Sequence, residues 1–182
     1  IELSRGYNSM LMVADYHALT TVKDPVQLHE NIINIARDYL AVGIDPEKDI
    51  LFQQSDVPEH MELAWIFQCL VSVSFLGLAH AYKDKVAKGL EANAGLFAYP
   101  MLMAADILLY DTDIVPVGTD QKQHVEYARE VAAKFNSAYG QTFKEPKEKI
   151  LRDTAVVPGT DGKKMSKSYN NTIPLFGTKE EI

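Results

Sequence analysis

The chain has 182 residues, 47% of them hydrophobic, which is enough for the core of one domain. Its formal net charge of −7 argues against a protein that coats nucleic acid. The single cysteine, Cys69, excludes disulfides within the chain and multi-cysteine zinc sites, and it points to a reducing compartment. Because Cys69 stands in an apolar stretch, we expect its side chain to be buried. No histidine spacing indicates a metal site.

Strand-like and helix-like segments alternate along the chain. Short apolar runs that end in polar residues predict strands at 9–15, 49–55 and 111–118. Apolar residues at helical spacing predict helices at 24–43, 60–73, 99–110 and 119–140. This order is typical of an α/β fold, a parallel sheet with helices on both faces. Ligands bind such sheets at the carboxyl ends of strands, so we expect the chemistry at 15–17 and 118–121.

Two of the predicted helices show a defined inner face, and a third contains a proline. In 24–43 the apolar residues on one face are Leu28, Ile32, Ile35, Tyr39 and Leu40. In 119–140 they are Val125, Ala128, Ala132 and Phe135. Pro100 is expected near the start of its helix. The apolar run 94–110 is broken by Pro100 and Asp106 and is too short to span a membrane.

The segment after the third strand reads VGTDQKQH. Gly118 lets a ligand approach the backbone closely, and the free N–H groups of the next helix attract negative charge. Asp120 accepts hydrogen bonds from hydroxyls, and Gln121 both donates and accepts them. The set suits a ribose and a zwitterionic small molecule. Ordinary capping of the helix by Asp120 explains the same residues equally well.

One carboxylate interrupts the apolar helix. Tyr99, Met103, Asp106 and Tyr110 are spaced by four, three and four residues, so they share one face. A buried carboxylate needs a partner. That partner is either a helix end or an arginine elsewhere in the fold, or an N–H group of a ligand. An indole suits the second alternative, because its nitrogen only donates.

The stretch GTDGKKMSKSYNNT, at 159–172, gathers Lys163, Lys164 and Lys167 in an acidic chain. Its glycines, hydroxyls and asparagines predict a mobile loop, in which lysines and N–H groups form a clamp for phosphate. The alternative is a solvated surface. The spacing is not that of a P-loop.

These segments together carry a resemblance. Residues 164–168 read KMSKS, the signature of class I aminoacyl-tRNA synthetases. With DYHALTT, YPMLMAADILLY and PVGTDQKQHVEYARE, the whole chain resembles the bacterial tryptophanyl-tRNA synthetases. The resemblance implies a Rossmann-like catalytic domain over 1–182. It also implies that the HIGH-type motif precedes the chain and that the helical anticodon-binding region follows it.

The resemblance also implies roles for particular residues and for partners. The residues matched to L-tryptophan are Asp106 at the indole N–H, Met103, Val117 and Tyr99 along the ring, and Gln121 and His17 near the polar end. Those matched to ATP are Gly118, Asp120, Lys164, Met165, Ser166 and Lys167, with Lys85 at the triphosphate. ATP brings Mg²⁺, and no permanent metal is expected. The product is tryptophanyl-tRNA(Trp), made by a cytoplasmic homodimer whose interface includes 65–79. The alternatives are a tyrosine–tRNA ligase and a non-catalytic sensor of tryptophan or nucleotide.

Overall fold

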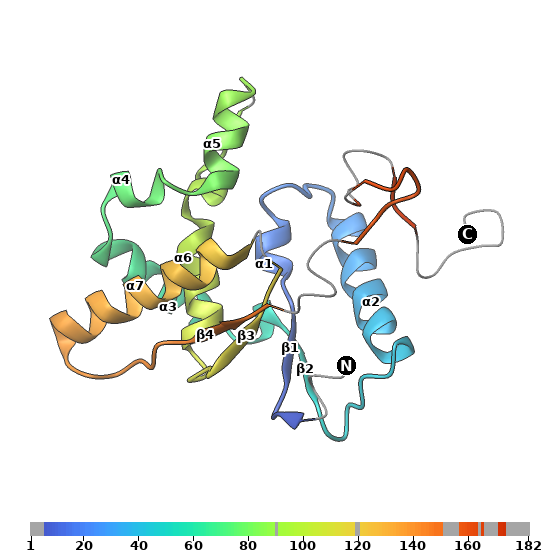
Figure 1. Ribbon diagram of the computed structural model, residues 1–182, viewed down its shortest axis with the longest axis horizontal. Coiled ribbons are helices and arrows are strands. Elements are labelled where there is room, and N and C mark those ends of the chain that lie inside the picture. Colours follow the sequence, from blue (N-terminus) through green and yellow to red (C-terminus); the bar gives the residue numbers. More distant parts are fainter. Residues whose placement is uncertain are drawn as a thin grey trace.

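The computed structural model describes residues 6–89, 91–118, 121–150, 157–163, 165 and 171–173. Four strands lie at the centre, with α2 (Pro25–Ala41) on one side and α3 (Glu59–Leu70), α6 (Ala94–Leu108) and α7 (Lys122–Tyr139) on the other (Figure 1). The α/β class is therefore confirmed.

The strands form two parallel pairs in the described part of the chain. β1 (Met10–Val13) pairs with β2 (Ile50–Gln53), with Val13 opposite Gln53. β3 (Ile114–Pro116) pairs with β4 (Lys147–Lys149). The sequence pattern predicts the first three strands but not β4, whose Lys-Glu-Lys sequence has no apolar residue. The expected single sheet thus appears as two pairs.

Helix α2 begins and ends where its sequence predicts. The Asp24 carboxylate accepts hydrogen bonds from the N–H groups of Val26 and Gln27, and Gly43 follows the helix with a φ of 97°. The predicted inner face is only half right, because Ile35 and Leu40 are 43% and 47% exposed. No residue of α2 is fully buried.

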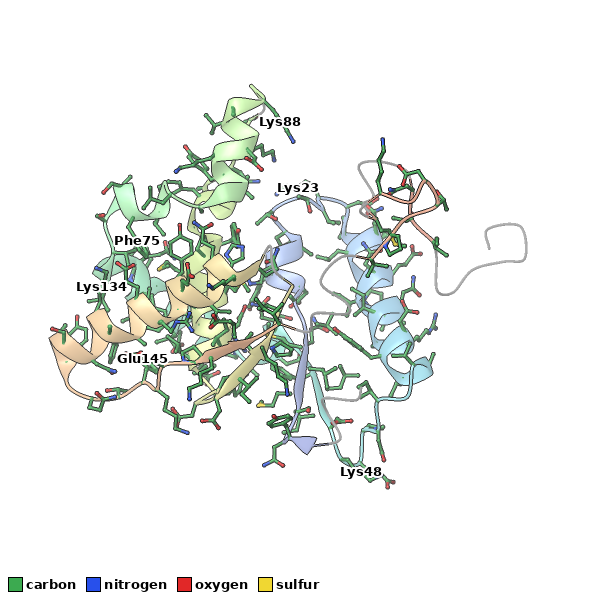
Figure 2. All side chains as sticks on the ribbon, viewed as in Figure 1. Lys23, Lys48, Phe75, Lys88, Lys134 and Glu145 are labelled. Atoms are coloured by element: carbon green, nitrogen blue, oxygen red, sulfur yellow. The ribbon has the colours of Figure 1, made fainter. Side chains whose placement is uncertain are left out.

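The core lies between α3, α6 and α7. Phe67, Met101 and Val131 are fully buried there. Val125, Ala128 and Ala132 are also 0% exposed, and Phe135 packs against the cluster, so the predicted inner face of α7 is confirmed. At the edge of this region the Lys134 ammonium lies 5.8 Å from the centre of the Phe75 ring (Figure 2).

Helix α6 begins five residues earlier than predicted. The Asn93 side chain accepts a hydrogen bond of 2.8 Å from the N–H of Leu96 and so caps it. Pro100 therefore lies inside the helix, not near its start. Its ring is fully buried, and core packing offsets the backbone hydrogen bond that proline cannot make.

Four short elements have too few residues for a periodic pattern to predict them. They are α1 (Asp15–Ala18), η2 (Gln54–Asp56), α4 (Val73–Leu76) and α5 (His80–Ala87). The predicted helix 60–73 ends at Leu70, where the chain turns before α4. No helix in the described ranges is long and apolar enough to cross a membrane.

The expectation that Cys69 is buried was wrong. Its side chain is exposed on the outer side of α3, where Met61 and Trp65 are also exposed, 45% and 67% respectively. These residues are spaced by four and share one helix face. An apolar stretch predicts burial only if both helix faces are covered, and α3 packs on α6 and α7 with one face alone.

Candidate functional site

The accessible face of α6 is the one that the sequence spacing identifies. Seven residues of this helix are buried: Pro100, Met101, Leu102, Ala104, Ala105, Ile107 and Leu108. Tyr99, Met103 and Asp106 are only partly buried, as is Tyr110 just past the helix end. The core therefore buries most of the second half of α6 and leaves this mixed polar and apolar face partly accessible.

The Asp106 carboxylate has protein partners on both of its oxygens. Its Oδ2 lies 2.8 Å from Nε2 of His17, and its Oδ1 accepts a hydrogen bond of 2.7 Å from Nε2 of Gln54. Nδ1 of His60 approaches the same Oδ1 at 2.7 Å. Neither an arginine nor a helix end is needed to explain how this carboxylate is tolerated at 9% exposure.

Gln54 is oriented unambiguously by its two contacts. Its Oε1 accepts a hydrogen bond of 3.2 Å from the N–H of Tyr16, so its amide nitrogen faces Asp106. The neighbouring Asp15 carboxylate accepts hydrogen bonds from the Gln53 side chain and the Ser55 N–H, at 2.8 and 3.0 Å. These bonds tie the carboxyl ends of β1 and β2 together beside α6.

His60 connects Asp106 to Tyr110. It is 0% exposed, and its Nε2 lies 2.8 Å from the Tyr110 hydroxyl. The contact between Nδ1 and Asp106 is short, but the N–H direction is poorly aligned with the carboxylate oxygen. Burial, followed by the charges of Asp106 and Glu59, raises the pKa of Tyr110, so this hydroxyl keeps its proton at neutral pH.

Tyr99 closes one end of the same face. Its hydroxyl lies 3.1 Å from Nε2 of His124 on α7, and its ring meets that of His17 edge to face at 6.1 Å. Burial is the main reason that the pKa of Tyr99 is raised. His17, which the resemblance matches to the polar end of the amino acid, contacts Asp106 through its Nε2 at 2.8 Å, and its role toward a ligand stays a prediction.

The end of β3 supplies the other predicted contacts. Val117 and Gly118 are partly buried, and the Val117 N–H donates to the carbonyl of Lys149 at 3.1 Å. Gln121 is the N-cap residue just before α7, and its N–H donates to the Gly118 carbonyl at 3.0 Å. Asp120 lies outside the described residues, so its alternative roles stay open.

The lysine loop is described at 157–163, 165 and 171–173. A tight turn joins its two sides: the Gly159 N–H donates to the Lys163 carbonyl at 2.7 Å, and the Thr160 N–H donates to that of Asn171 at 3.0 Å. The Asn171 amide and the Lys163 N–H both donate to Asp161, which lowers the pKa of that carboxyl.

The structure describes only one of the four loop residues predicted for ATP. Lys164, Ser166 and Lys167 lie outside the described residues, and Met165 donates its N–H to the Val157 carbonyl at 2.8 Å. Lys85 is partly buried on α5, which packs against α6. The clamp of lysines therefore stays a prediction from the sequence.

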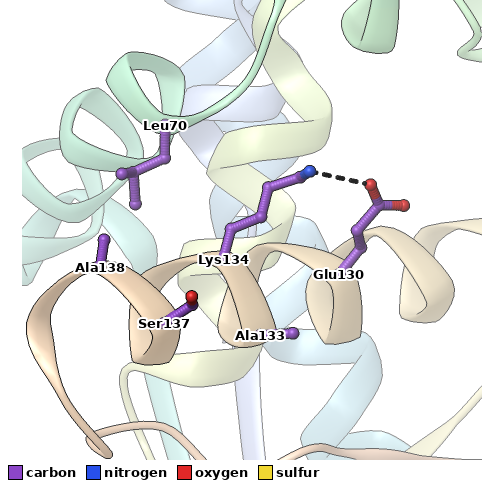
Figure 3. A pocket seen from close by; sticks show the side chains of 6 residues that line it. All are labelled: Leu70, Glu130, Ala133, Lys134, Ser137 and Ala138. Atoms are coloured by element: carbon purple, nitrogen blue, oxygen red, sulfur yellow. Dashed lines mark ion pairs between the residues drawn. The ribbon is translucent and has the colours of Figure 1, made fainter.

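Two hollows lie near these elements, and only one contains predicted site residues. A hollow of about 450 Å³ is lined by His17 and Tyr99, together with residues of α3 and the start of α6. A shallow hollow of about 530 Å³ lies between Leu70 and α7, where Lys134 and Glu130 form an ion pair of 3.2 Å (Figure 3). It contains no residue that the sequence predicts for the site.

Sequence reasoning missed Gln54, His60 and His124. A signal existed for Gln54, because it follows directly on β2 and the carboxyl ends of strands are where ligands bind. No periodic signal marks His60 or His124, since each is brought to the site by helix packing. In the described parts of the chain, no group of three or more His, Cys, Asp or Glu side chains is arranged to hold a metal ion.

Comparison with known proteins agrees with this geometry. The family model described as tRNA synthetases class I (W and Y) matches residues 1–182. The chain is 55% identical to a tryptophan–tRNA ligase of Fusobacterium nucleatum over 183 residues, and to one of Rhodopirellula baltica over 182. Each match covers all of this chain but only 56% and 57% of those relatives, so the chain spans about half their length.

A solved structure gives the same result. The tryptophanyl-tRNA synthetase of Campylobacter jejuni, in complex with ADP and tryptophan, matches with a TM-score of 0.92 and 50% sequence identity. The match covers 98% of this chain and 56% of that one.

Proposed function

Because the chain belongs to the class I tRNA synthetases of the tryptophan and tyrosine type, we propose that its protein is a tryptophan–tRNA ligase. It activates L-tryptophan with ATP to tryptophanyl-adenylate and transfers the amino acid to tRNA(Trp). The observation that carries this proposal is Asp106, a carboxylate held by Gln54 on a partly accessible face of a mostly buried helix. The likeness to ligases named for tryptophan supports it.

In this proposal the indole lies along the accessible face of α6. Asp106 accepts its N–H, while Met103 and Tyr99 line the ring from the same helix. Val117 borders the ring from the end of β3, and Gln121 contacts the polar end of the amino acid. A hydrogen-bonding site of this kind rejects a ligand without the partner group far better than it rejects a change of size.

ATP lies across the ends of the strands. Gly118 and Asp120 contact its ribose, Lys85 helps to hold the triphosphate, and the loop 164–167 closes over the phosphates. The tryptophan carboxylate attacks the α-phosphorus, and the bond from that phosphorus to the bridging oxygen breaks, which releases pyrophosphate. Positioning and the lysine charges stabilise this displacement. Mg²⁺ arrives with ATP and is held mainly by the phosphates.

The same proposal covers the assembly and the setting of the protein. The chain is most of a catalytic domain, and the missing length carries the rest of the ATP site and the tRNA-binding region. The outer face of α3 and α4, where Trp65 and Val73 are 67% and 75% exposed, suits the interface of a homodimer. The proposal places the protein in the cytoplasm, and a free, exposed Cys69 supports a reducing compartment.

Amino-acid-dependent exchange of pyrophosphate into ATP tests the function on the intact protein. Exchange driven by tryptophan and not by tyrosine is expected. Exchange with tyrosine alone would identify a tyrosine–tRNA ligase. Tryptophan binding without any exchange would identify a sensor and would leave the lysine loop unexplained.

A further inference from the structure

The two oxygens of Asp106 are occupied to different extents. A carboxylate oxygen has two lone pairs, so the group accepts about four hydrogen bonds. Oδ1 is approached at 2.7 Å by both Gln54 Nε2 and His60 Nδ1, whereas Oδ2 is approached by His17 alone, at 2.8 Å. Oδ1 therefore accepts the Gln54 hydrogen bond and is enclosed by the His60 ring, and Oδ2 is the oxygen left open to a ligand.

The two side chains that contact Oδ1 are also the buried ones. Gln54 and His60 are both 0% exposed, whereas the His17 side chain is 22% exposed. The less enclosed oxygen, Oδ2, is thus the one nearer to the accessible side. Because Gln54 and His60 hold the carboxylate from its buried side, it presents a single acceptor atom, Oδ2, toward the accessible side.

The Asp106 carboxylate and the Tyr110 hydroxyl together favour one tautomer of His60. A proton on Nδ1, 2.7 Å from Asp106 Oδ1, avoids repulsion between lone pairs at that distance, although its N–H is not aligned for a hydrogen bond. In the neutral ring Nε2 is then the acceptor, and it takes the Tyr110 O–H at 2.8 Å. Phe52 of β2 packs against both rings. Its ring centre lies 6.1 Å from that of His60 and 5.6 Å from that of Tyr110, so it shields the contact between His60 and Tyr110 from water.

We propose that Gln54, His60 and Tyr110 are positioning residues that fix Asp106 so that only Oδ2 accepts one N–H of the substrate ring. They set the specificity for a ring with an N–H donor without touching the ring. This inference rests on the proposed role of Asp106 as the acceptor of the indole N–H.

The test compares L-tryptophan with β-(3-benzothienyl)-L-alanine, in which sulfur replaces the indole N–H at nearly the same size. The measured quantity is the ratio of kcat/KM for the two amino acids in pyrophosphate exchange by the intact protein. Substitution of a residue that only supports the fold lowers kcat/KM equally for both amino acids and leaves the ratio unchanged.

The His60 variants separate its two nitrogens. In His60→Asn the amide nitrogen replaces Nδ1 beside Asp106, whereas in His60→Gln it replaces Nε2 and faces Tyr110 instead. We expect His60→Gln to lower the preference for tryptophan about tenfold and His60→Asn to keep most of it. Tyr110→Phe removes a single hydroxyl and is expected to lower the ratio about threefold. His29→Asn and Tyr139→Phe, both at exposed positions, are the matched controls.

The outcomes separate the role of Asp106 from the role of the residues that position it. If the unsubstituted protein exchanges with tryptophan but does not distinguish it from the sulfur analogue, the role of Asp106 fails and the positioning inference fails with it. If the protein discriminates and the His60 and Tyr110 variants discriminate equally well or better, only the positioning inference is overturned. If the His60 variants do not fold, the ratio measured for Tyr110→Phe decides alone, since this substitution leaves the ring packing intact.

Discussion

The group around Asp106 and the lysine loop are held in opposite ways. Asp106 is fixed by side chains from three other elements, since His17, Gln54 and His60 come from α1, η2 and α3. The described part of the loop is fixed mainly by its own backbone, through the turn between Gly159 and Lys163. Lys163 is exposed, whereas Gln54 and His60 are fully buried.

This difference suggests a division of labour. A rigid network that exists before the ligand arrives is suited to recognising one ring, because its groups lose little freedom on binding. A backbone turn that carries an exposed lysine, Lys163, is suited to closing over a charged substrate, because it moves without disturbing the core. Substitutions in the first region are expected to change affinity for the amino acid, and those in the second to change the rate.

The largest effect is expected for Lys164→Ala. Loss of one positive charge at the leaving pyrophosphate lowers kcat for exchange by about 100-fold, while the Kd for tryptophan stays the same. Stopped-flow measurement of adenylate formation, with calorimetry for tryptophan, separates the two quantities. Lys48→Ala, whose ammonium belongs to a side chain that is 80% exposed, is the control. If the affinity for tryptophan fell as much as kcat, the loop would not act on the rate alone, and the proposed difference between the two regions would be wrong.

Asp106→Ala tests the other region. A hydrogen bond to a charged group contributes roughly 1.5–3 kcal/mol, so the KM for tryptophan is expected to rise about 10- to 100-fold with little change in the KM for ATP. Steady-state exchange with each substrate varied in turn measures both. If both KM values rise together, Asp106 has a role in folding and not in recognition, and a lower Tm would accompany that result.

A smaller effect is expected for Gly159→Ala in the loop. An added Cβ would lie 2.4 Å from the Asn171 carbonyl oxygen and 2.5 Å from Cγ of the same residue, so the turn must shift. Displaced lysines are expected to lower kcat about tenfold, with the Tm unchanged. Gly6→Ala, where no atom lies within 4 Å of the new Cβ, is the control. A Tm that falls while kcat stays constant would show that the turn supports the fold.

Much of the fold was predictable because its long elements carry local signals. Asp24 and Gly43 mark the ends of α2, and helical spacing marks the inner face of α7. The exposure of Cys69 was not predictable, because it depends on which face of α3 meets the other helices. Strand β4 is defined only by its partner β3, since its own sequence is polar.

The candidate site was also predictable only where its residues carry a local signal in the sequence. Asp106 stands out as a charge in an apolar helix, and the KMSKS loop as a motif. The donors that hold Asp106 do not, because Gln54 and His60 lie 52 and 46 residues away and meet it only through tertiary packing. A sequence pattern therefore identifies the group that we propose to face the ligand and misses the groups that contact it.

Helix α3 also carries two residues that make it accessible to fluorescence measurements. Its inner face presents His60 to Asp106, while its outer face carries Trp65 and Cys69, the one indole and the one thiol of this chain. Trp65 is therefore an intrinsic fluorophore on the helix that contacts the recognition site, and a thiol-reactive dye on Cys69 lies one helical turn away. Emission from Trp65 and from this dye is expected to change when another surface covers the outer face of α3. It is also expected to change if a ligand at Asp106 shifts the helix.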